Sequence, residues 1–311
     1  MVTNNRCIIC ESVSLQKINS YKHFWISCND CGNIKRERKD KYLVPRFLPK
    51  FIAKIFFPEK ALNKIYPMDE VIKNEKRFYD HYKEDSQLDV DSTKWAGESE
   101  TIKNNLKKLD ISVKNKNILD ISGGPGFVAL DLEHSANKVF VTEYSEIGVN
   151  GMKDNLGVNA IKFDYQNDKI SQILNEEKFD IVLINFSINF CLDLKSFILD
   201  LKKILIKKSI VYISFVPPTL GCCLRWQHDE YVYNILYHPE TMGRILSEAG
   251  FRPLKKIIYR RFGYLENMPL AKKLFLLPYF ILYTILALRP GLSIKKELIQ
   301  KDVLHIYEYM G

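Results

Sequence analysis

Short apolar runs separated by amphipathic stretches dominate the chain from residue 113 onward. The apolar runs predict strands, and the stretches between them, in which apolar residues recur every three or four positions, predict helices. We expect strands at 117–121, 138–143, 160–164, 179–185 and 209–216, and helices at 127–132, 194–206 and 239–249. Strands that alternate with helices are typical of a parallel sheet covered on both faces, so the pattern predicts an α/β fold.

The pattern changes before residue 113. Residues 1–42 are rich in turn-forming residues and end in a run of charged residues, whereas residues 43–112 alternate apolar and charged clusters in a way that predicts helices. We therefore divide the chain into a small N-terminal module (1–42), a helical linker or cap region (43–112) and an α/β domain (113–311).

The end of the α/β domain has a pattern of its own. We expect a strand at 254–262 and a last strand at 303–309, which would complete a seven-stranded sheet. An apolar insert at about 264–298 separates these two strands, and its apolar spacing predicts helix.

Composition and charge further restrict the class of protein and its partners. The 311 residues are 46% hydrophobic and 27% charged, which excludes a disordered, collagen-like or disulfide-scaffold protein. The formal net charge of +9 is unevenly spread: residues 1–60 carry +7, residues 251–300 carry +8, and residues 61–250 carry −5. The basic ends favour anionic partners, while the acidic centre argues against a phosphate-binding site there.

Two segments combine large apolar residues with neighbouring Lys and Arg: 47–57 and 274–288. As a helix, 274–288 would be roughly 22 Å long, which is too short for a hydrocarbon core of about 30 Å. Such segments suit an anionic membrane surface, but they also suit packing on each other or over a substrate pocket, and both alternatives stay open. Because the N-terminus lacks an apolar signal-peptide core, we expect a cytoplasmic protein, with the inner face of the membrane as a candidate partner surface.

Four cysteines lie in two matched pairs near the N-terminus. Cys7 and Cys10 form one Cys-x-x-Cys turn, and Cys28 and Cys31 form a second one after seventeen intervening residues. Two such turns supply the four sulfurs of a tetrahedral Zn²⁺ site with no position left for water, so the spacing predicts a structural zinc ribbon. A module this small has little core of its own, and we expect metal binding to supply most of its folding energy.

A glycine-rich loop follows the first predicted strand of the α/β domain. The strand ends at Asp120-Ile121, and the loop reads Ser122-Gly123-Gly124-Pro125-Gly126. Gly124 and Gly126 superficially fit the dinucleotide fingerprint. Asp120, however, would lie directly beneath the loop, where a carboxylate repels a pyrophosphate and suits a cofactor that carries positive charge and no phosphate.

In these residues the chain resembles the class I S-adenosylmethionine-dependent methyltransferases, whose first motif is an apolar strand, an acid, an apolar residue and Gly-x-Gly-x-Gly. The chain departs from the motif at Ser122, where the family usually has the first glycine. The resemblance covers about residues 75–262 and implies a Rossmann-like seven-stranded sheet with S-adenosylmethionine as the cofactor. It implies that the cofactor is held by Asp120, Ser122, Gly123, Gly124, Gly126, Glu143, Asp164 and Asn185.

The spacing of the later residues agrees with this resemblance. Glu143 ends the next predicted strand, 23 residues after Asp120, where nucleotide-binding sheets place the acid that accepts the ribose hydroxyls. Asp164 ends the third predicted strand, where the family's acid binds the adenine amino group, and Asn185 ends the fourth, where the cofactor and substrate pockets of the family meet.

The sequence restricts the molecule that accepts the methyl group less than it restricts the cofactor. The position after the fourth strand reads Asn185-Phe186-Ser187-Ile188 and lacks the Pro-Pro-aromatic box of enzymes that methylate nucleobase amines. The stretch that follows resembles the family branch that acts on small molecules and sugars, so we expect a sugar or glycan-precursor hydroxyl, with a lipid-linked acceptor if the membrane alternative holds. Transfer to oxygen needs a base near neutral pH, and His228 and then His238 are the candidates, although either histidine could merely order its loop.

Two other functions stay open at this point. An RNA methyltransferase would use the basic zinc module to hold phosphates, but the acidic centre and the missing base-chemistry motifs weigh against it. A non-catalytic scaffold would bind the cofactor without turnover. The sequence does not give the oligomeric state.

Overall fold

The computed structural model describes residues 6–19, 23–38, 96–217, 235–260 and 300–311. Residues 43–95 of the expected helical region 43–112, His228 and the apolar insert at about 264–298 lie outside the described residues. Within them the chain forms two sheets, one of four strands and one of seven.

The seven-stranded sheet has the order β10-β11-β8-β7-β4-β5-β6. Its strands are β4 (Asn117–Ile121), β5 (Lys138–Glu143), β6 (Ala160–Lys162), β7 (Phe179–Asn185), β8 (Leu205–Phe215), β10 (Phe251–Arg260) and β11 (Gln300–Tyr309). The pairs among β4 to β8 are parallel, whereas β11 runs antiparallel to both β8 and β10. The predicted α/β fold and Rossmann-like seven-stranded sheet are confirmed.

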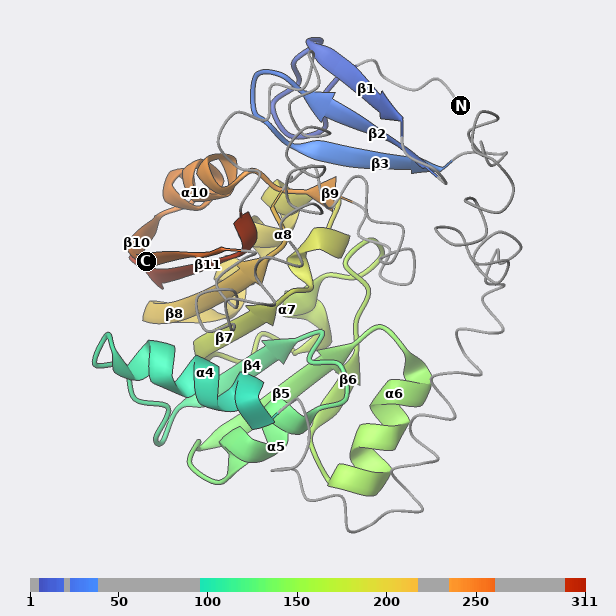
Figure 1. Ribbon diagram of the computed structural model, residues 1–311. Helices are drawn as coiled ribbons and strands as arrows, with labels where there is room; N and C mark the ends of the chain where they lie inside the picture. Colours follow the sequence, from blue (N-terminus) through green and yellow to red (C-terminus); the bar gives the residue numbers. More distant parts are fainter. Residues whose placement is uncertain (1–5, 20–22, 39–95, 218–234, 261–299) are drawn as a thin grey trace, which may run out of the picture.

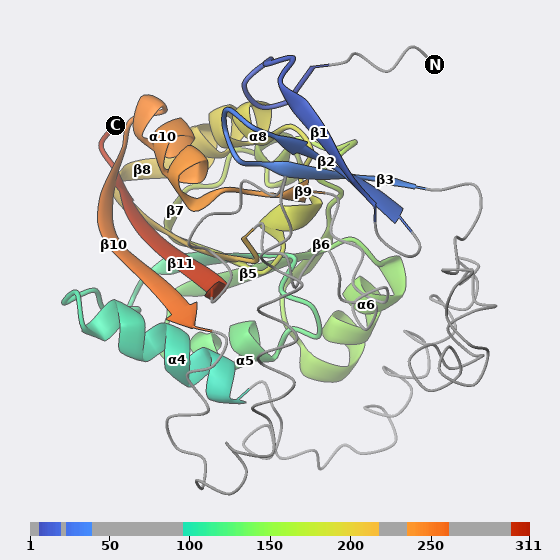
Figure 2. The ribbon, with the colours of Figure 1, turned by 45° about the horizontal axis from the view of Figure 1, so that its top comes forward.

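Helices cover both faces of this sheet (Figures 1 and 2). One face packs against α4 (Ala96–Lys107), α5 (Phe127–Glu133), and α6 (Glu146–Gly151) with its π-helical continuation Met152–Leu156. The other packs against α7 (Ile170–Ile173), α8 (Leu194–Leu201) and α10 (Pro239–Glu248). Alternate residues of one strand enter different cores, since Leu119 and Ile121 of β4 join the α8 side and Ile118 joins the α4 side.

The helix α4 comes from the region that we assigned to a linker or cap. Its residues Ile102 and Leu106 are fully buried in the core on the α5 side of the sheet. The end of the 43–112 region therefore packs as part of the α/β domain.

The predicted helix at 194–206 is too long and the predicted strand at 209–216 too short. The helix α8 ends at Leu201, a 3-10 turn covers Lys202–Ile204, and β8 begins at Leu205. Pairing with β7 jumps from Phe179–Leu205 to Ile181–Ile210, so the intervening residues bulge outward, and Lys208 has a φ of 71°. The Ser209 hydroxyl stabilises the bulge by donating to the carbonyl of Phe179 at 2.7 Å. Leu205 continues the apolar spacing of α8 in the sequence, but pairing with Phe179 of β7 makes it the first residue of the strand.

The small sheet belongs to the N-terminal module and has the order β1-β2-β3-β9. Its strands are β1 (Leu15–Asn19), β2 (His23–Cys28), β3 (Ile34–Arg38) and β9 (Ile235–Leu236). The module packs over the α8 and α10 side of the large sheet, where Cys7, Ile9, Cys28 and Cys31 join the same core as residues of those helices (Figure 2).

Candidate active site and cysteine cluster

The residues expected to bind the cofactor gather at one edge of the large sheet. The strands β7, β4, β5 and β6 are neighbours in that order and run parallel, so their carboxyl ends meet at the same edge. Open α/β sheets bind ligands at this edge. Asp120, Ser122–Gly126, Glu143, Asp164 and Asn185 lie at or directly after these four ends.

The loop after β4 depends on a close backbone approach. Ser122 and Gly124 both have left-handed backbones, with φ of 55° and 59°. The backbone N–H groups of Ser122 and Gly123 donate to the Oγ1 and carbonyl oxygen of Thr142 on β5, each at 3.1 Å. A Cβ on Gly123 would lie 2.5 Å from Oδ2 of Asp120 and 2.9 Å from Cγ1 of Val141, so no side chain fits there.

Ser122 shows how the chain tolerates its departure from the family motif. The left-handed conformation costs roughly 1–2 kcal/mol for a residue with a Cβ. The bond from its N–H to Thr142 holds the residue in this conformation. The loop thus keeps the shape that a glycine would adopt.

Asp120 is a buried acid among other acids. Its side chain is 2% exposed. Burial, and after it the charges of Glu98 and Glu143, raises the pKa of its carboxyl to about 7. Glu98 lies in the first turn of α4, outside the predicted motif, and no feature of the sequence singled it out. Three carboxyl groups close to one another make this part of the edge suitable for a cation and unsuitable for a phosphate.

Glu143 is oriented by three backbone donors. Its Oε1 accepts hydrogen bonds from the N–H groups of Tyr144 at 2.8 Å and Ser145 at 3.3 Å. Its Oε2 accepts a bond from the N–H of Gly124 at 3.2 Å. The carboxylate is therefore held toward the glycine loop, as its expected role at the ribose requires.

Asp164 and Asn185 make different kinds of hydrogen bonds at this edge. Asp164 accepts bonds from the N–H of Gln166 at 2.9 Å and from Nδ2 of Asn167 at 2.6 Å, so it closes its own turn after β6. Asn185 donates through Nδ2 to Glu98 at 3.2 Å and accepts a bond from the Ser214 hydroxyl. Asn185 thus ties the edge of the sheet to α4.

Tyr165 and Ser187 form a second polar contact near the loop. The two hydroxyls lie 3.0 Å apart, and Ser187 donates to the carbonyl of Ile121 at 3.0 Å. Burial raises the pKa of the Tyr165 hydroxyl well above its usual range. Neither residue has a sequence pattern of its own: Tyr165 directly follows Asp164, and Ser187 lies two residues after Asn185.

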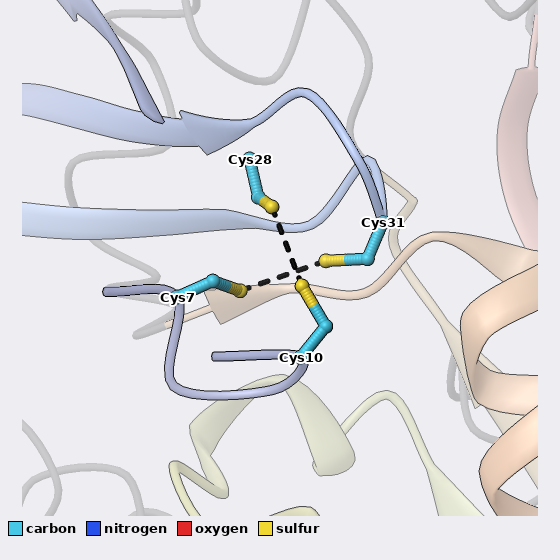
Figure 3. A group of neighbouring side chains, drawn as sticks. All are labelled: Cys7, Cys10, Cys28 and Cys31. Atoms are coloured by element: carbon cyan, nitrogen blue, oxygen red, sulfur yellow. Dashed lines mark hydrogen bonds between the residues drawn. The ribbon is translucent and has the colours of Figure 1, made fainter. Parts of the chain in front are cut away.

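The four cysteines come together as the sequence predicted. Their sulfurs all lie within 4.8 Å of one another, and the pairs Cys7–Cys31 and Cys10–Cys28 are each 3.5 Å apart (Figure 3). A tetrahedral Zn²⁺ with Zn–S bonds of about 2.3 Å separates its sulfurs by about 3.8 Å. The donor set and its spacing therefore fit a Zn²⁺ ion.

The two Cys-x-x-Cys turns share one backbone geometry. The N–H of Glu11 donates to the carbonyl of Cys7 at 2.8 Å, and that of Gly32 donates to the carbonyl of Cys28 at 2.9 Å. Glu11 and Gly32 are both left-handed, with φ of 62° and 69°. Glycine favours this conformation, whereas the glutamate at position 11 gives no signal for it in the sequence. Equivalent turns that face each other are the arrangement of a four-cysteine metal site.

Of the two candidate bases, the described residues include His238. His238 is the N-cap residue of α10, and its Nδ1 accepts a bond from the N–H of Glu240 at 3.3 Å. A neutral imidazole that accepts at Nδ1 carries its hydrogen on Nε2, so in this state the ring caps the helix and has no free lone pair for a proton.

Comparison with known proteins identifies the domain in which these residues lie. Residues 119–213 match the family described as "Methyltransferase domain". The search of curated proteins gives no match.

Solved structures share the fold at low identity. A protein provisionally named a sarcosine dimethylglycine methyltransferase, from Galdieria sulphuraria, is 10% identical with a TM-score of 0.50, over 76% of this chain and 98% of its own. An S-adenosylmethionine-dependent methyltransferase from Archaeoglobus fulgidus is 17% identical with a TM-score of 0.47, over 68% and 94%. The N-methyltransferase NodS from Bradyrhizobium japonicum, solved with S-adenosylhomocysteine, is 12% identical with a TM-score of 0.45, over 75% and 98%.

The large sheet with its edge site is thus a methyltransferase domain, and the protein is an enzyme. The family match and the fold support a class I S-adenosylmethionine-dependent methyltransferase, and a four-cysteine module precedes the matched residues.

Proposed function

We propose that S-adenosylmethionine binds at the carboxyl edge of β4, β5 and β6, through the residues that the sequence predicted. The observation that carries this proposal is the buried Asp120, whose carboxyl lies close to Glu98 and Glu143. When bound, the cofactor supplies a methyl group on a positively charged sulfur. The chain's part is to attract that charge with its carboxylates and to let the ligand approach the backbone at Gly123 and Gly124.

Each residue then has a distinct task. Glu143 presents a carboxylate already held by three N–H groups, which suits two ribose hydroxyls. Asp164 orders the turn after β6 and has lone pairs left to accept a bond from an adenine amino group. Asn185 and Glu98 connect this edge to α4, which covers one side of it.

We further propose that Cys7, Cys10, Cys28 and Cys31 hold one structural Zn²⁺ ion. Elemental analysis of protein purified without added metal should find about one equivalent of zinc per chain. A Cys28→Ser change should lose the metal and unfold the module, because metal binding supplies most of its stability. Protein that contains no metal, or a disulfide among these cysteines, would refute the site.

For the acceptor, we propose a hydroxyl of a sugar or glycan precursor. The support is the sequence after β7, which resembles the small-molecule and sugar branch of the family. In-line transfer to oxygen requires a base that removes the hydroxyl proton. His228 is the favoured base, because His238 would have to release the N-terminus of α10 before it could accept a proton.

The experiment that tests the acceptor uses methyl-labelled S-adenosylmethionine. The purified protein is incubated with nucleotide-linked sugars, lipid-linked sugars, total RNA and unfractionated protein, and the label is followed into each class. Label in a sugar fraction, reduced at least a hundredfold by His228→Ala, is the expected result. Label in RNA would favour the alternative function, and cofactor binding without transfer to any class would indicate a scaffold.

Membrane contact stays a prediction. No helix among the described residues is long and apolar enough to cross a bilayer, and the two apolar segments, 47–57 and 274–288, lie outside those residues. Flotation with anionic vesicles at low salt is the test, because electrostatic attraction is strongest there. Protein that stays in the soluble fraction under these conditions would exclude a lipid-bound acceptor held in this way.

A further inference from the structure

The cysteine module and the methyltransferase domain share a sheet. β3 pairs with β9, with Ile34 opposite Leu236 and Lys35 opposite Ile235. β9 lies in the chain between the segment after β8 and the helix α10. A strand of the methyltransferase domain therefore completes the sheet of the module.

Asn33 connects a cysteine ligand to the start of α10. Its side chain is buried, and its Nδ2 donates to the sulfur of Cys31 at 3.0 Å. Its Oδ1 accepts the N–H of His238, the N-cap residue of α10, at 2.7 Å. A single amide thus bonds both the candidate metal site and the helix terminus.

Two further contacts reinforce this connection. The Thr241 hydroxyl donates to the carbonyl of Cys31 at 2.7 Å. Gly32 lies so close to His238 that an added Cβ would be 2.6 Å from its ring carbon Cδ2. The second Cys-x-x-Cys turn is therefore packed directly against the first turn of α10.

Asn189 links β9 to the carboxyl edge of the large sheet through hydrogen bonds. This fully buried residue lies in the 3-10 turn Ile188–Phe190, just after Asn185 at the end of β7. Its Nδ2 donates to the carbonyl of Ile235 in β9 at 2.8 Å and to that of Val216 at 3.0 Å. Its Oδ1 accepts the N–H of Val216 at 2.9 Å. The end of β8 and the start of β9 are thereby joined beside the residues expected at the cofactor.

We propose that Asn33 is a positioning residue through which the metal-bound module holds β9 and the N-terminus of α10 against the carboxyl edge of the sheet. The metal fixes the Cys31 sulfur, and the fixed sulfur orients the Asn33 amide toward His238. Loss of the metal then loosens β9 and the start of α10, while the loop after β4 keeps its shape. The inference rests on the proposed zinc site and concerns the acceptor side of the proposed methyltransferase site.

Hydrogen exchange measured by mass spectrometry on the full-length protein tests this coupling. In the wild type, removal of zinc with a chelator should accelerate exchange in peptides that cover 235–242 by at least tenfold, because loss of the bond from His238 to Asn33 alone corresponds to about tenfold. Peptides that cover β4 and β5 should not change. Equal acceleration in both regions, or none at 235–242, would overturn the proposal.

Variants of Asn33 distinguish a positioning role of its side chain from a general effect on folding. Asn33→Ala should retain zinc and show fast exchange at 235–242 even with the metal bound. Asn33→Asp keeps an acceptor oxygen for the His238 N–H but has no donor for the Cys31 sulfur, so it should protect the His238 amide less well than asparagine does. The matched control is Asn29→Ala in the same turn, whose exposed side chain donates to the Ser14 hydroxyl at 3.2 Å and which should exchange like the wild type.

Loss of zinc from Asn33→Ala would require a further variant. If Asn33→Ala loses its zinc, Thr241→Val provides the test, since it removes the bond to the Cys31 carbonyl and leaves the sulfur untouched. Thr241→Val should then accelerate exchange at 235–242 with zinc retained, and wild-type exchange would overturn the proposal. Calorimetric titration with S-adenosylmethionine reports the cofactor site separately, so failure of the proposed cofactor site is distinguishable from failure of this coupling.

Discussion

Glu143 at the end of β5 and Gly124 in the loop after β4 are joined by a hydrogen bond of 3.2 Å from the glycine N–H to Oε2. The bond links two parts of the cofactor site that come from different strands. Since the carboxylate is already oriented, little conformational entropy remains to be lost when a ligand binds to it. The site is in this respect arranged before its cofactor arrives.

Replacing Glu143 with alanine should weaken S-adenosylmethionine binding by about 1–3 kcal/mol, because charge-assisted bonds to the ribose are lost. Isothermal titration calorimetry measures the change. Glu146→Ala is the matched control: this exposed neighbour pairs with Lys162 at 3.2 Å, and its removal should leave the affinity unchanged. Equal affinities of the wild type and Glu143→Ala would contradict the ribose assignment.

The affinity for S-adenosylmethionine should depend on the protonation of Asp120. Burial, with Glu98 and Glu143 nearby, raises the pKa of Asp120 to about 7 in the free protein, so the carboxyl is largely protonated at pH 6. A bound cation favours the carboxylate and lowers this pKa, so binding at pH 6 should release up to about one proton and weaken as the pH falls below 7. Calorimetry in buffers of different ionisation enthalpy measures the released protons.

The control for this prediction is Asp120→Asn, which keeps the size of the side chain and cannot ionise. It should bind more weakly, and its binding should release about one proton fewer at pH 6 than that of the wild type. Identical proton release in the two proteins would show that another group controls the pH dependence.

Gly123→Ala should damage both stability and cofactor binding. The new Cβ would lie 2.5 Å from the Asp120 carboxylate and 2.9 Å from Val141, and both neighbours are held by strands of the core. Overpacking of this kind costs about 1–3 kcal/mol. Urea unfolding should show the loss, whereas Gly97→Ala, where nothing lies within 4 Å, should be neutral or slightly stabilising. Unchanged stability of Gly123→Ala would mean that the loop relaxes easily.

His305 should make the folded state sensitive to acid. This residue of β11 is 2% exposed, and none of the residues that the structure describes bonds its Nε2, while its Nδ1 lies 2.9 Å from the Tyr307 hydroxyl. Burial, with the charge of Lys256 on the neighbouring strand, lowers its pKa from 6.5 to about 4. As the pH falls from 6.5 to 4, the unfolded chain takes up a proton that the folded protein does not. The free energy of unfolding therefore falls, by up to about 3 kcal/mol.

Replacing His305 with leucine isolates this contribution. Between pH 7.5 and pH 4 the variant should gain up to about 3 kcal/mol relative to the wild type in denaturant unfolding, because it has no imidazole to protonate. The exposed His134 serves as the control position, and His134→Leu should follow the wild-type pH profile. A constant difference between wild type and His305→Leu across this range would refute the assignment.

The apolar runs in the sequence predicted most strands of the large sheet, because the signal for a strand lies within a few consecutive residues. The bounds of β4, β5 and β7 agree with the predicted ones, since each is an apolar run that ends at a turn or a polar residue. The bounds of β8 did not, because Leu205 continues the apolar spacing of α8 and Lys207 and Lys208 interrupt the apolar run of the strand, whereas pairing with β7 begins at Leu205. The third strand was predicted two residues too long, since Phe163 continues the apolar run beyond the last pair with β5.

The sequence by itself determined the class of fold, the glycine loop with its acids, and the pairing of the four cysteines. Each of these depends on residues within one strand and turn, or on the spacing of two Cys-x-x-Cys turns, so the pattern is complete within a short stretch. Only the tertiary structure brought Glu98 to Asn185, 87 residues away, and Asn33 to His238, 205 residues away. These contacts are made by single amide, carboxyl and backbone groups, which leave no periodicity in the sequence. Their partners are decided by how the helices and the module pack on the finished sheet.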